Sequence, residues 1–178
     1  MRFLSLIVFT AGLPLSCVAN THAHMHGHSD NALGNALQIG NESNGKPLYL
    51  CIAKLFNSAQ PGKTWEGYGQ CNVPYGGKEY VLSDFRVPAR QFFNKVSWQN
   101  NPGSPIVIGR DSNGSPLFLC QSFFQGSNQP GKTWPGYNHC NISFGGREII
   151  LNNYRILGTN EIVVRSHQNT PRAITQHW

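Results

Sequence analysis

The chain has 178 residues, a formal charge of +6 at neutral pH, and 12% charged against 39% hydrophobic residues. This length suits one ordinary domain or two small ones, and the low charge density excludes an intrinsically disordered chain. Five cysteines are too few for a small disulfide-dense scaffold, and their odd number indicates that at least one has a different fate from the others.

Residues 1–19 have the features of a secretory signal peptide. Arg2 precedes an apolar run over residues 3–15, and small residues follow up to Ala19. The run is too short to cross a bilayer core of about 30 Å as a helix, and no later segment is as apolar, so we expect no membrane span. Cleavage after Ala19 would remove Cys17 and deliver the protein to an oxidising compartment, extracellular or, in a bacterium, periplasmic. Lipid attachment at Cys17 is the weaker alternative, because the leucine of a bacterial lipobox is missing.

Residues 20–33 form a histidine-rich segment that we expect to be flexible. Alternating imidazoles can bind copper or zinc, and cleavage after Ala19 would place a histidine third from a free amine, an arrangement that binds copper or nickel. A solvated linker without metal is an equal alternative. The four candidate ligands are His22, His24, His26 and His28.

The rest of the chain contains two copies of one unit. The sequence QPGKTW occurs at residues 60–65 and again at 129–134, and the same offset of 69 relates GGKE at 76–79 to GGRE at 145–148. We therefore expect a first repeat at 34–102, a second repeat at 103–171 and a C-terminal tail at 172–178.

Within each unit the pattern is that of strands and turns. Short runs rich in β-branched or aromatic residues lie between clusters of glycine, proline and asparagine, and no window has a sustained helical stripe. The Asn-Gly pairs at 44–45 and 113–114 predict hairpin turns, and the Gly-Gly pairs at 76–77 and 145–146 predict further turns or bulges. The expected strands include residues 105–108, 117–120, 148–151 and 161–165. We expect an all-β fold of two antiparallel halves related by a pseudo-twofold axis.

The four cysteines of the two units repeat at one interval. Cys51 and Cys71 are 20 residues apart, as are Cys120 and Cys140. This repetition favours one disulfide within each unit, which would stabilise it by roughly 3 kcal/mol in the chain-entropy model. A four-cysteine zinc site is the weaker alternative, because zinc sites usually contain closely spaced pairs, and redox catalysis lacks a C-x-x-C motif.

The repeated motifs resemble the DM9 repeat (the DUF3421 family). The resemblance rests on residues 40–49, 61–63 and 71–79 of the first copy and on residues 109–118, 130–132 and 144–148 of the second. It implies a small all-β lectin with a pseudo-twofold arrangement that binds mannose-type sugars. It also implies that a homodimer can form, as related tandem proteins do.

The resemblance implies one sugar site in each repeat, built from an acidic residue and the lysine of the Pro-Gly-Lys motif. Carried over by position, these are Asp111 with Lys132 in the second repeat and Glu42 with Lys63 in the first. Glutamate extends its carboxylate by one methylene, so we expect the first site to be weaker or differently selective.

Side-chain chemistry supports the same interpretation. A carboxylate that accepts and an ammonium that donates can together hold two sugar hydroxyls. Trp65 and Trp134 follow the lysines by two residues and could stack on a pyranose ring. The alternatives are that Pro-Gly-Lys is only a turn and that the tryptophans are core residues, and for the tryptophans we favour the core slightly. Glu79 and Glu148 are either further sugar ligands or ion-pair partners of the lysines, and we favour ion pairs.

These features predict a secreted carbohydrate-binding protein without catalysis and without a required cofactor. A glycosidase would need two carboxylates about 5 to 10 Å apart, whereas the duplicated acids belong to separate units. Scattered basic residues argue against nucleic-acid binding. The alternative function is a secreted copper- or zinc-binding or surface-interaction protein that acts through the histidine segment.

Overall fold

The computed structural model describes residues 33–159. The predicted signal peptide, the four candidate metal ligands, the expected strand at 161–165 and the C-terminal tail lie outside these residues. Within the described range, no helix has the length and apolar character needed to cross a membrane.

The described residues form the all-β structure that the sequence predicts, in antiparallel strands and one short 3₁₀ turn, η2 (Arg90–Phe93). The first repeat contributes β1 (Gln38–Asn41), β2 (Pro47–Leu55), β3 (Ser58–Thr64), β4 (Cys71–Tyr75), β5 (Lys78–Leu82), β6 (Phe85–Arg86) and β7 (Ser97–Gln99). The second contributes β8 (Ser104–Pro105), β9 (Val107–Arg110), β10 (Pro116–Phe124), β11 (Ser127–Thr133), β12 (Cys140–Phe144), β13 (Arg147–Leu151) and β14 (Arg155–Thr159).

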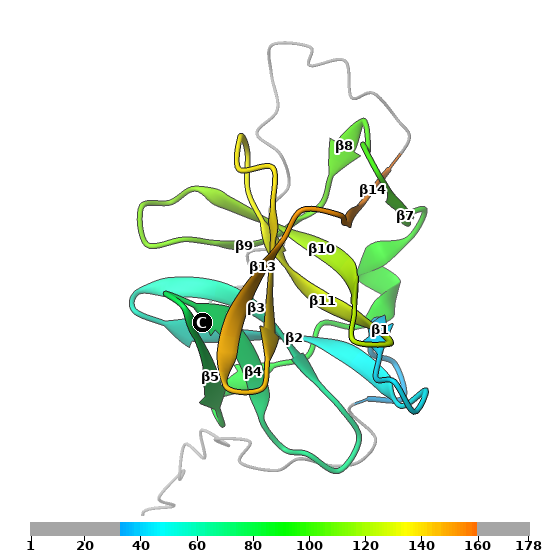
Figure 1. Ribbon diagram of the computed structural model, residues 1–178, viewed down its shortest axis with the longest axis vertical. Helices are drawn as coiled ribbons and strands as arrows, with labels where there is room; N and C mark the ends of the chain where they lie inside the picture. The colour runs from blue at the N-terminus through cyan, green and yellow to red at the C-terminus, as the bar shows by residue number, and fades with distance from the viewer. Residues whose placement is uncertain (1–32, 160–178) are drawn as a thin grey trace, which may run out of the picture.

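Strands of the two repeats are interleaved in one closed circuit of pairings. β1 pairs with β2 and with β11, β11 pairs with β10, β10 with β9, β9 with β3, and β3 with β2. Figure 1 shows β3 and β11 near the middle of the molecule, between β4 and β10. Exchanging each strand for its equivalent in the other repeat leaves the circuit unchanged, which confirms the predicted pseudo-twofold arrangement.

Two equivalent hairpins, β4–β5 and β12–β13, make a second junction between the repeats. The Cα atoms of Lys78 and Arg147 face each other where β5 pairs with β13. The Glu79 carboxylate accepts a hydrogen bond from the Gly146 amide at 2.7 Å, and the Glu148 carboxylate accepts one from the Gly77 amide at 2.7 Å. Glu79 and Glu148 thus join the two hairpins and are not simply ion-pair partners of the lysines.

Glycines form the hairpin turns that the sequence predicts. Gly45 and Gly114 have φ of 83° and 81°, in the left-handed region that glycine adopts without steric cost. The sequence does not predict the turns at residues 56–57 and 125–126, in which both positions also have positive φ. Phe56 and Gln125, which begin these turns, are not typical residues for positive φ.

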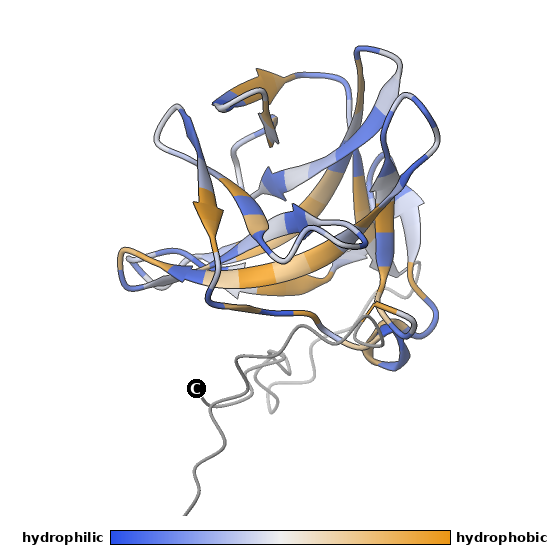
Figure 2. Ribbon diagram, turned by 90° about the horizontal axis from the view of Figure 1, so that it is seen from below, coloured by the Kyte–Doolittle hydropathy of each residue, from blue (hydrophilic) through white to orange (hydrophobic). Residues whose placement is uncertain are grey.

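Hydrophobic residues pack in one central cluster and in two smaller clusters, one per repeat. The central cluster contains Ile39, Leu50, Ile52, Phe93, Ile108, Leu119 and Leu157. The smaller clusters each include a predicted disulfide, Cys51–Cys71 or Cys120–Cys140, and both disulfides are formed. Figure 2 shows hydrophobic positions along the strands and mainly hydrophilic residues at the hairpin turns.

The two repeats approach each other closely at two equivalent glycines. A Cβ on Gly40 would lie 2.2 Å from the carbonyl oxygen of Asn128, and one on Gly109 would lie 2.1 Å from that of Ala59. Only a residue without a side chain fits at these crossings, which bring the start of each hairpin beside the central strand of the other repeat.

Candidate functional site

The Pro-Gly-Lys motif lies inside a strand and not in a turn. It forms part of β3 in the first repeat and of β11 in the second. A Cβ on Gly62 would lie 2.5 Å from the Asn72 carbonyl oxygen and 2.8 Å from the Cys71 Sγ, and Gly131 is equally crowded by Asn141. The glycine therefore allows the neighbouring strand to approach, and the turn interpretation is wrong.

The first candidate site contains residues of both repeats. Lys63 is 4% exposed, and its Nζ donates a hydrogen bond to the Gln129 Oε1 at 2.5 Å. Gln129 Nε2 in turn donates to the Glu42 Oε2 at 3.1 Å. Glu42 Oε1 lies 3.9 Å from the lysine Nζ. The predicted pair of Glu42 and Lys63 is thus brought together, with a glutamine of the second repeat bridging it.

The second candidate site has the same arrangement with the repeats exchanged. Lys132, also 4% exposed, donates from Nζ to the Gln60 Oε1 at 2.6 Å. Gln60 Nε2 donates to the Asp111 Oδ1 at 3.1 Å. Aspartate is one methylene shorter than glutamate, so Asp111 meets the lysine through this amide, whereas Glu42 also reaches Lys63 as an ion pair.

Both bridging glutamines were missed by the sequence analysis. Gln60 and Gln129 are 0% exposed, and each also donates to a serine hydroxyl of its own strand, Ser58 or Ser127, at 2.9 or 3.0 Å. They are the first residues of the unchanged QPGKTW match. Their position in an unchanged motif is the signal by which the sequence could have identified them. The spacing of the residues alone does not show that each glutamine binds the lysine of the opposite repeat.

An aromatic ring from the opposite repeat lies beside each lysine. Lys63 Nζ is 5.5 Å from the ring centre of Phe144, and Lys132 Nζ is 4.6 Å from that of Tyr75. A cation at this distance from a ring face is attracted by the ring quadrupole. Each lysine is thus held by an amide, a ring and a nearby carboxylate, and two of these three groups come from the other repeat.

Burial lowers the pKa of both lysines, because an ammonium loses hydration in this environment. For Lys132 the pKa falls to about 8, although Glu148 and Asp111 favour the charged form. For Lys63 the pKa is also lowered by burial, and Glu42 followed by Glu79 opposes the change. The nearest carboxylate thus has the larger charge effect in the first site, consistent with the longer reach of Glu42.

Trp65 and Trp134 are half-buried and do not belong to the core clusters, so the core interpretation is wrong for both. Trp65 stacks on Tyr68 with ring centres 3.7 Å apart, and Trp134 stacks on Tyr137 at 3.6 Å. Lys46 Nζ, on the same hairpin turn as Glu42, lies 5.7 Å from the centre of the Trp65 ring. Each stacked pair therefore presents aromatic surface to solvent close to the end of the lysine-bearing strand.

A groove of about 360 Å³ opens beside Asp111. Lys54 and Arg110 lie in its wall together with Asp111, and Ser58 is also among its lining residues. The groove gives a ligand access to the acidic residue of the second site, since Asp111 is half-buried while Lys132 is buried.

Comparison with known protein families identifies the repeat. The DM9 repeat matches residues 15–82 and 42–151, two overlapping positions that together cover most of the chain. The chain belongs to the DM9 repeat family. No curated protein matches it. Among solved structures, this DM9 chain is similar to the crystal structure of the nematode sperm cell motility protein MFP2B, with 17% identity and a TM-score of 0.46. The match covers 71% of this DM9 chain and 40% of that chain, so the similarity extends over less than half of MFP2B.

The metal prediction concerns residues outside the described part of this DM9 chain. His22, His24, His26 and His28 all precede residue 33. Between residues 33 and 159, no group of three or more histidine, cysteine or acidic residues could hold a metal ion. The copper or zinc prediction therefore depends on the histidine segment alone.

Proposed function

We propose that this DM9 repeat protein binds carbohydrate, specifically mannose-type glycans, at two equivalent sites around Lys63 and Lys132, and that it catalyses no reaction. The observation that supports this proposal best is the chain of carboxylate, amide and ammonium that occurs twice with the repeats exchanged. Family membership adds support, because tandem DM9 proteins include lectins.

The proposed contacts follow from hydrogen-bonding capacity. A neutral sugar offers adjacent hydroxyls that both donate and accept. The carboxylate of Glu42, in a side chain that is 30% exposed, accepts from one hydroxyl, and the ammonium of Lys63 donates to its neighbour. Gln129 fixes the lysine side chain and so reduces the rotamer entropy that a mobile lysine would lose on binding.

The carboxylates support binding more than hydrolysis. Hydrolysis of a glycosidic bond usually needs a second carboxylate at the site, and Glu79 is the second acid that influences Lys63. Both Glu79 oxygens accept hydrogen bonds, from Asn72 Nδ2 at 2.8 Å and from the Gly146 amide at 2.7 Å. Both carboxylate oxygens of Glu79 are therefore used in holding the β4–β5 and β12–β13 hairpins.

Two sites on one chain favour a surface that displays many copies of the sugar. Once one site is occupied, the second binds at a high effective concentration, which raises avidity without any new contact. The two disulfides are consistent with an extracellular location, where such surfaces occur. We propose secretion as part of this function.

Isothermal titration with mannose and with mannan tests the proposal. The variant with Lys63→Met and Lys132→Met should lose binding by about a hundredfold or more, because both donors are removed. Lys78→Met, which removes an exposed lysine of the β5 hairpin, should keep the affinity within about twofold. Unchanged affinity in the double variant would refute the assignment of these sites.

A further inference from the structure

One groove of the described residues has no part in the proposed mannose sites. It has a volume of about 550 Å³ and lies between β1, the β10 and β11 strands, and the segment that carries η2. Neither lysine of the mannose sites lines it, and neither does a bridging glutamine. Its lining residues are Leu33, Gly34, Ala36, Leu37, Gln38, Gly40, Asn41, Tyr49, Arg90, Trp98, Gln121, Asn128 and Arg155.

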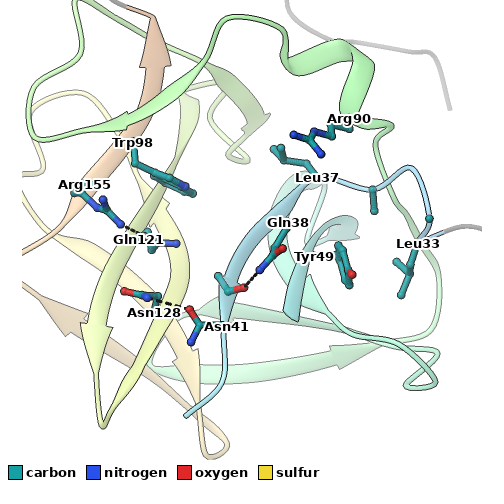
Figure 3. A pocket seen from close by; sticks show the side chains of 13 residues that line it. Leu33, Leu37, Gln38, Asn41, Tyr49, Arg90, Trp98, Gln121, Asn128 and Arg155 are labelled. Carbon is teal, nitrogen blue, oxygen red and sulfur yellow. Dashed lines mark hydrogen bonds between the residues drawn. The ribbon is translucent and has the colours of Figure 1, made fainter. Parts of the chain in front are cut away.

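The charge of this groove has one sign. Arg90 and Arg155 contribute two guanidinium groups, and none of the lining residues is acidic. Figure 3 shows Arg155 and Trp98 on one side of the groove and Tyr49 on the other. Two arginines without a carboxylate among the lining residues favour an oxyanion, since a guanidinium donates two parallel hydrogen bonds to a carboxylate or sulfate.

A buried glutamine holds one of these arginines in place. Gln121 is 7% exposed, its Nε2 donates to the Ile39 carbonyl oxygen at 2.7 Å, and its Oε1 accepts from Arg155 Nη2 at 2.6 Å. Figure 3 shows the last of these bonds at the groove wall. The arginine is thus positioned before any ligand arrives, which reduces the entropy lost on binding.

The pseudo-twofold relation shows that the fold does not require the two side-chain amides Gln121 and Asn128 of this lining. The positions equivalent to Gln121 and Asn128, at an offset of 69, are Ile52 and Ala59. Ile52 is 2% exposed and packs in the central cluster. Ala59 lines the smaller groove, which contains the acidic Asp111. At these two positions one repeat therefore carries side-chain amides where the other has apolar side chains.

The remaining lining residues suit a sugar. Asn128 Nδ2 donates to the Asn41 Oδ1 at 2.9 Å, and such side-chain amides both donate to and accept from hydroxyls. Trp98 and Tyr49 are half-buried, and rings with an apolar face and a polar edge pack well on pyranoses. We propose that this groove binds an acidic saccharide, one that carries a carboxylate or a sulfate group, and that it does so independently of the mannose sites.

Titration of the full chain with three hexasaccharides tests this proposal. The probes are hexagalacturonate, a sulfated carrageenan-derived hexasaccharide and neutral maltohexaose. We expect binding of at least one acidic probe, with an affinity that falls as salt is raised from about 50 to about 300 mM, and weaker binding of maltohexaose. Which acidic probe binds more tightly identifies carboxylate or sulfate as the preferred group. Failure of both acidic probes to bind at about 1 mM, or equal binding of maltohexaose, would overturn the proposal.

Charge-reversal variants locate the site. Arg90→Glu and Arg155→Glu should each weaken binding of the acidic probe at least tenfold, an order-of-magnitude expectation for an interfacial cation. The matched control Arg147→Glu removes an exposed arginine on β13, outside the groove, and should change affinity about twofold or less. An equal loss in the control would show diffuse attraction to a basic protein and would contradict a site in the groove.

Two further measurements separate this site from folding defects and from the mannose sites. Because Arg90 is exposed, we expect Arg90→Glu to fold normally, and thermal unfolding checks this. The Lys63→Met and Lys132→Met double variant should bind the acidic probe unchanged even though mannose binding is lost. Loss of acidic-probe binding in that variant would show that the lysine sites, and not the groove, hold the acidic saccharide.

Discussion

Gln60 and Gln129 occupy strand positions at which a core would normally have an apolar side chain. Both are 0% exposed and satisfy their amide groups through a serine, a carboxylate and a lysine. A buried polar group left without a partner costs roughly 1–3 kcal/mol, so such a network is stable only when all its members are present. At the residue scale, these glutamines fix where each lysine ammonium lies.

The lowered pKa of Lys132 makes stability depend on pH in a definite direction. In the unfolded chain a lysine has a pKa of about 10.4, and in the folded protein that of Lys132 is about 8. Between these values the unfolded state binds more protons, so the free energy of unfolding contributed by this group rises with pH. We expect a slope of up to about 1.4 kcal/mol per pH unit between about pH 8 and 10.

Urea unfolding at several pH values measures this slope. Comparison with Lys132→Met isolates the contribution of Lys132 from those of other groups that titrate in the same range. The variant should have a smaller slope because it binds no proton at this position. Identical slopes in the two proteins would contradict the lowered pKa of buried Lys132.

At the element scale, β3 and β11 each carry a bridging glutamine and a lysine, and both pack closely against the following strand. Gly62 lies where β4 approaches, beside the Cys51–Cys71 disulfide. The strand can approach this closely because Gly62 has no Cβ. This close approach also pairs Lys63 with Asn72 of β4 in the sheet register.

Gly62→Ala should therefore be strongly destabilising. The added Cβ would lie 2.5 Å from the Asn72 carbonyl oxygen, and relief would require a backbone shift that costs about 2 kcal/mol or more. Gly76→Asn is a suitable control, because Gly76 has a φ of 58° and open space around it, and asparagine tolerates that conformation. Denaturant unfolding should separate the two variants clearly. An alanine at 62 that leaves stability unchanged would be evidence against the described packing of β3 on β4.

Local signals in the sequence predicted the local structure well. The turns at 44–45 and 113–114 and both disulfides are formed, because glycine, asparagine and cysteine spacing act over short distances. The alternative that Pro-Gly-Lys is only a turn is wrong, although proline and glycine usually mark turns, because here the glycine allows a close approach of strands. That approach depends on a partner strand, which a local pattern does not contain.

At the scale of the whole molecule, the two repeats cannot be separated without breaking the strand circuit. β1 pairs with β11, β3 pairs with β9, and β5 pairs with β13. The sequence predicted two similar halves but not this exchange of partners, because equal repeats indicate symmetry and not which strands meet across the axis. The bridging glutamines act on the opposite repeat for the same reason.

A single repeat should not fold alone. A fragment of residues 33–102 would leave β1 without its partner β11 and β3 without its partner β9. It would also expose Ile39, Leu50 and Ile52 of the central cluster. Small units with little buried area are marginal even when intact. Circular dichroism and NMR should show an unfolded chain, and cooperative unfolding of the fragment would contradict the interleaved arrangement.

The most direct test of the central claim, that each sugar site is assembled from both repeats, places one glutamine variant in two single-site proteins. Lys63→Met leaves only the site of Lys132, and Lys132→Met leaves only the site of Lys63. Adding Gln60→Met should abolish mannose binding in the first protein and leave it within about twofold in the second, because Gln60 bonds to Lys132 across the repeats. The opposite result, loss of binding only where Lys63 remains, would show that each repeat builds its own site and would contradict this account.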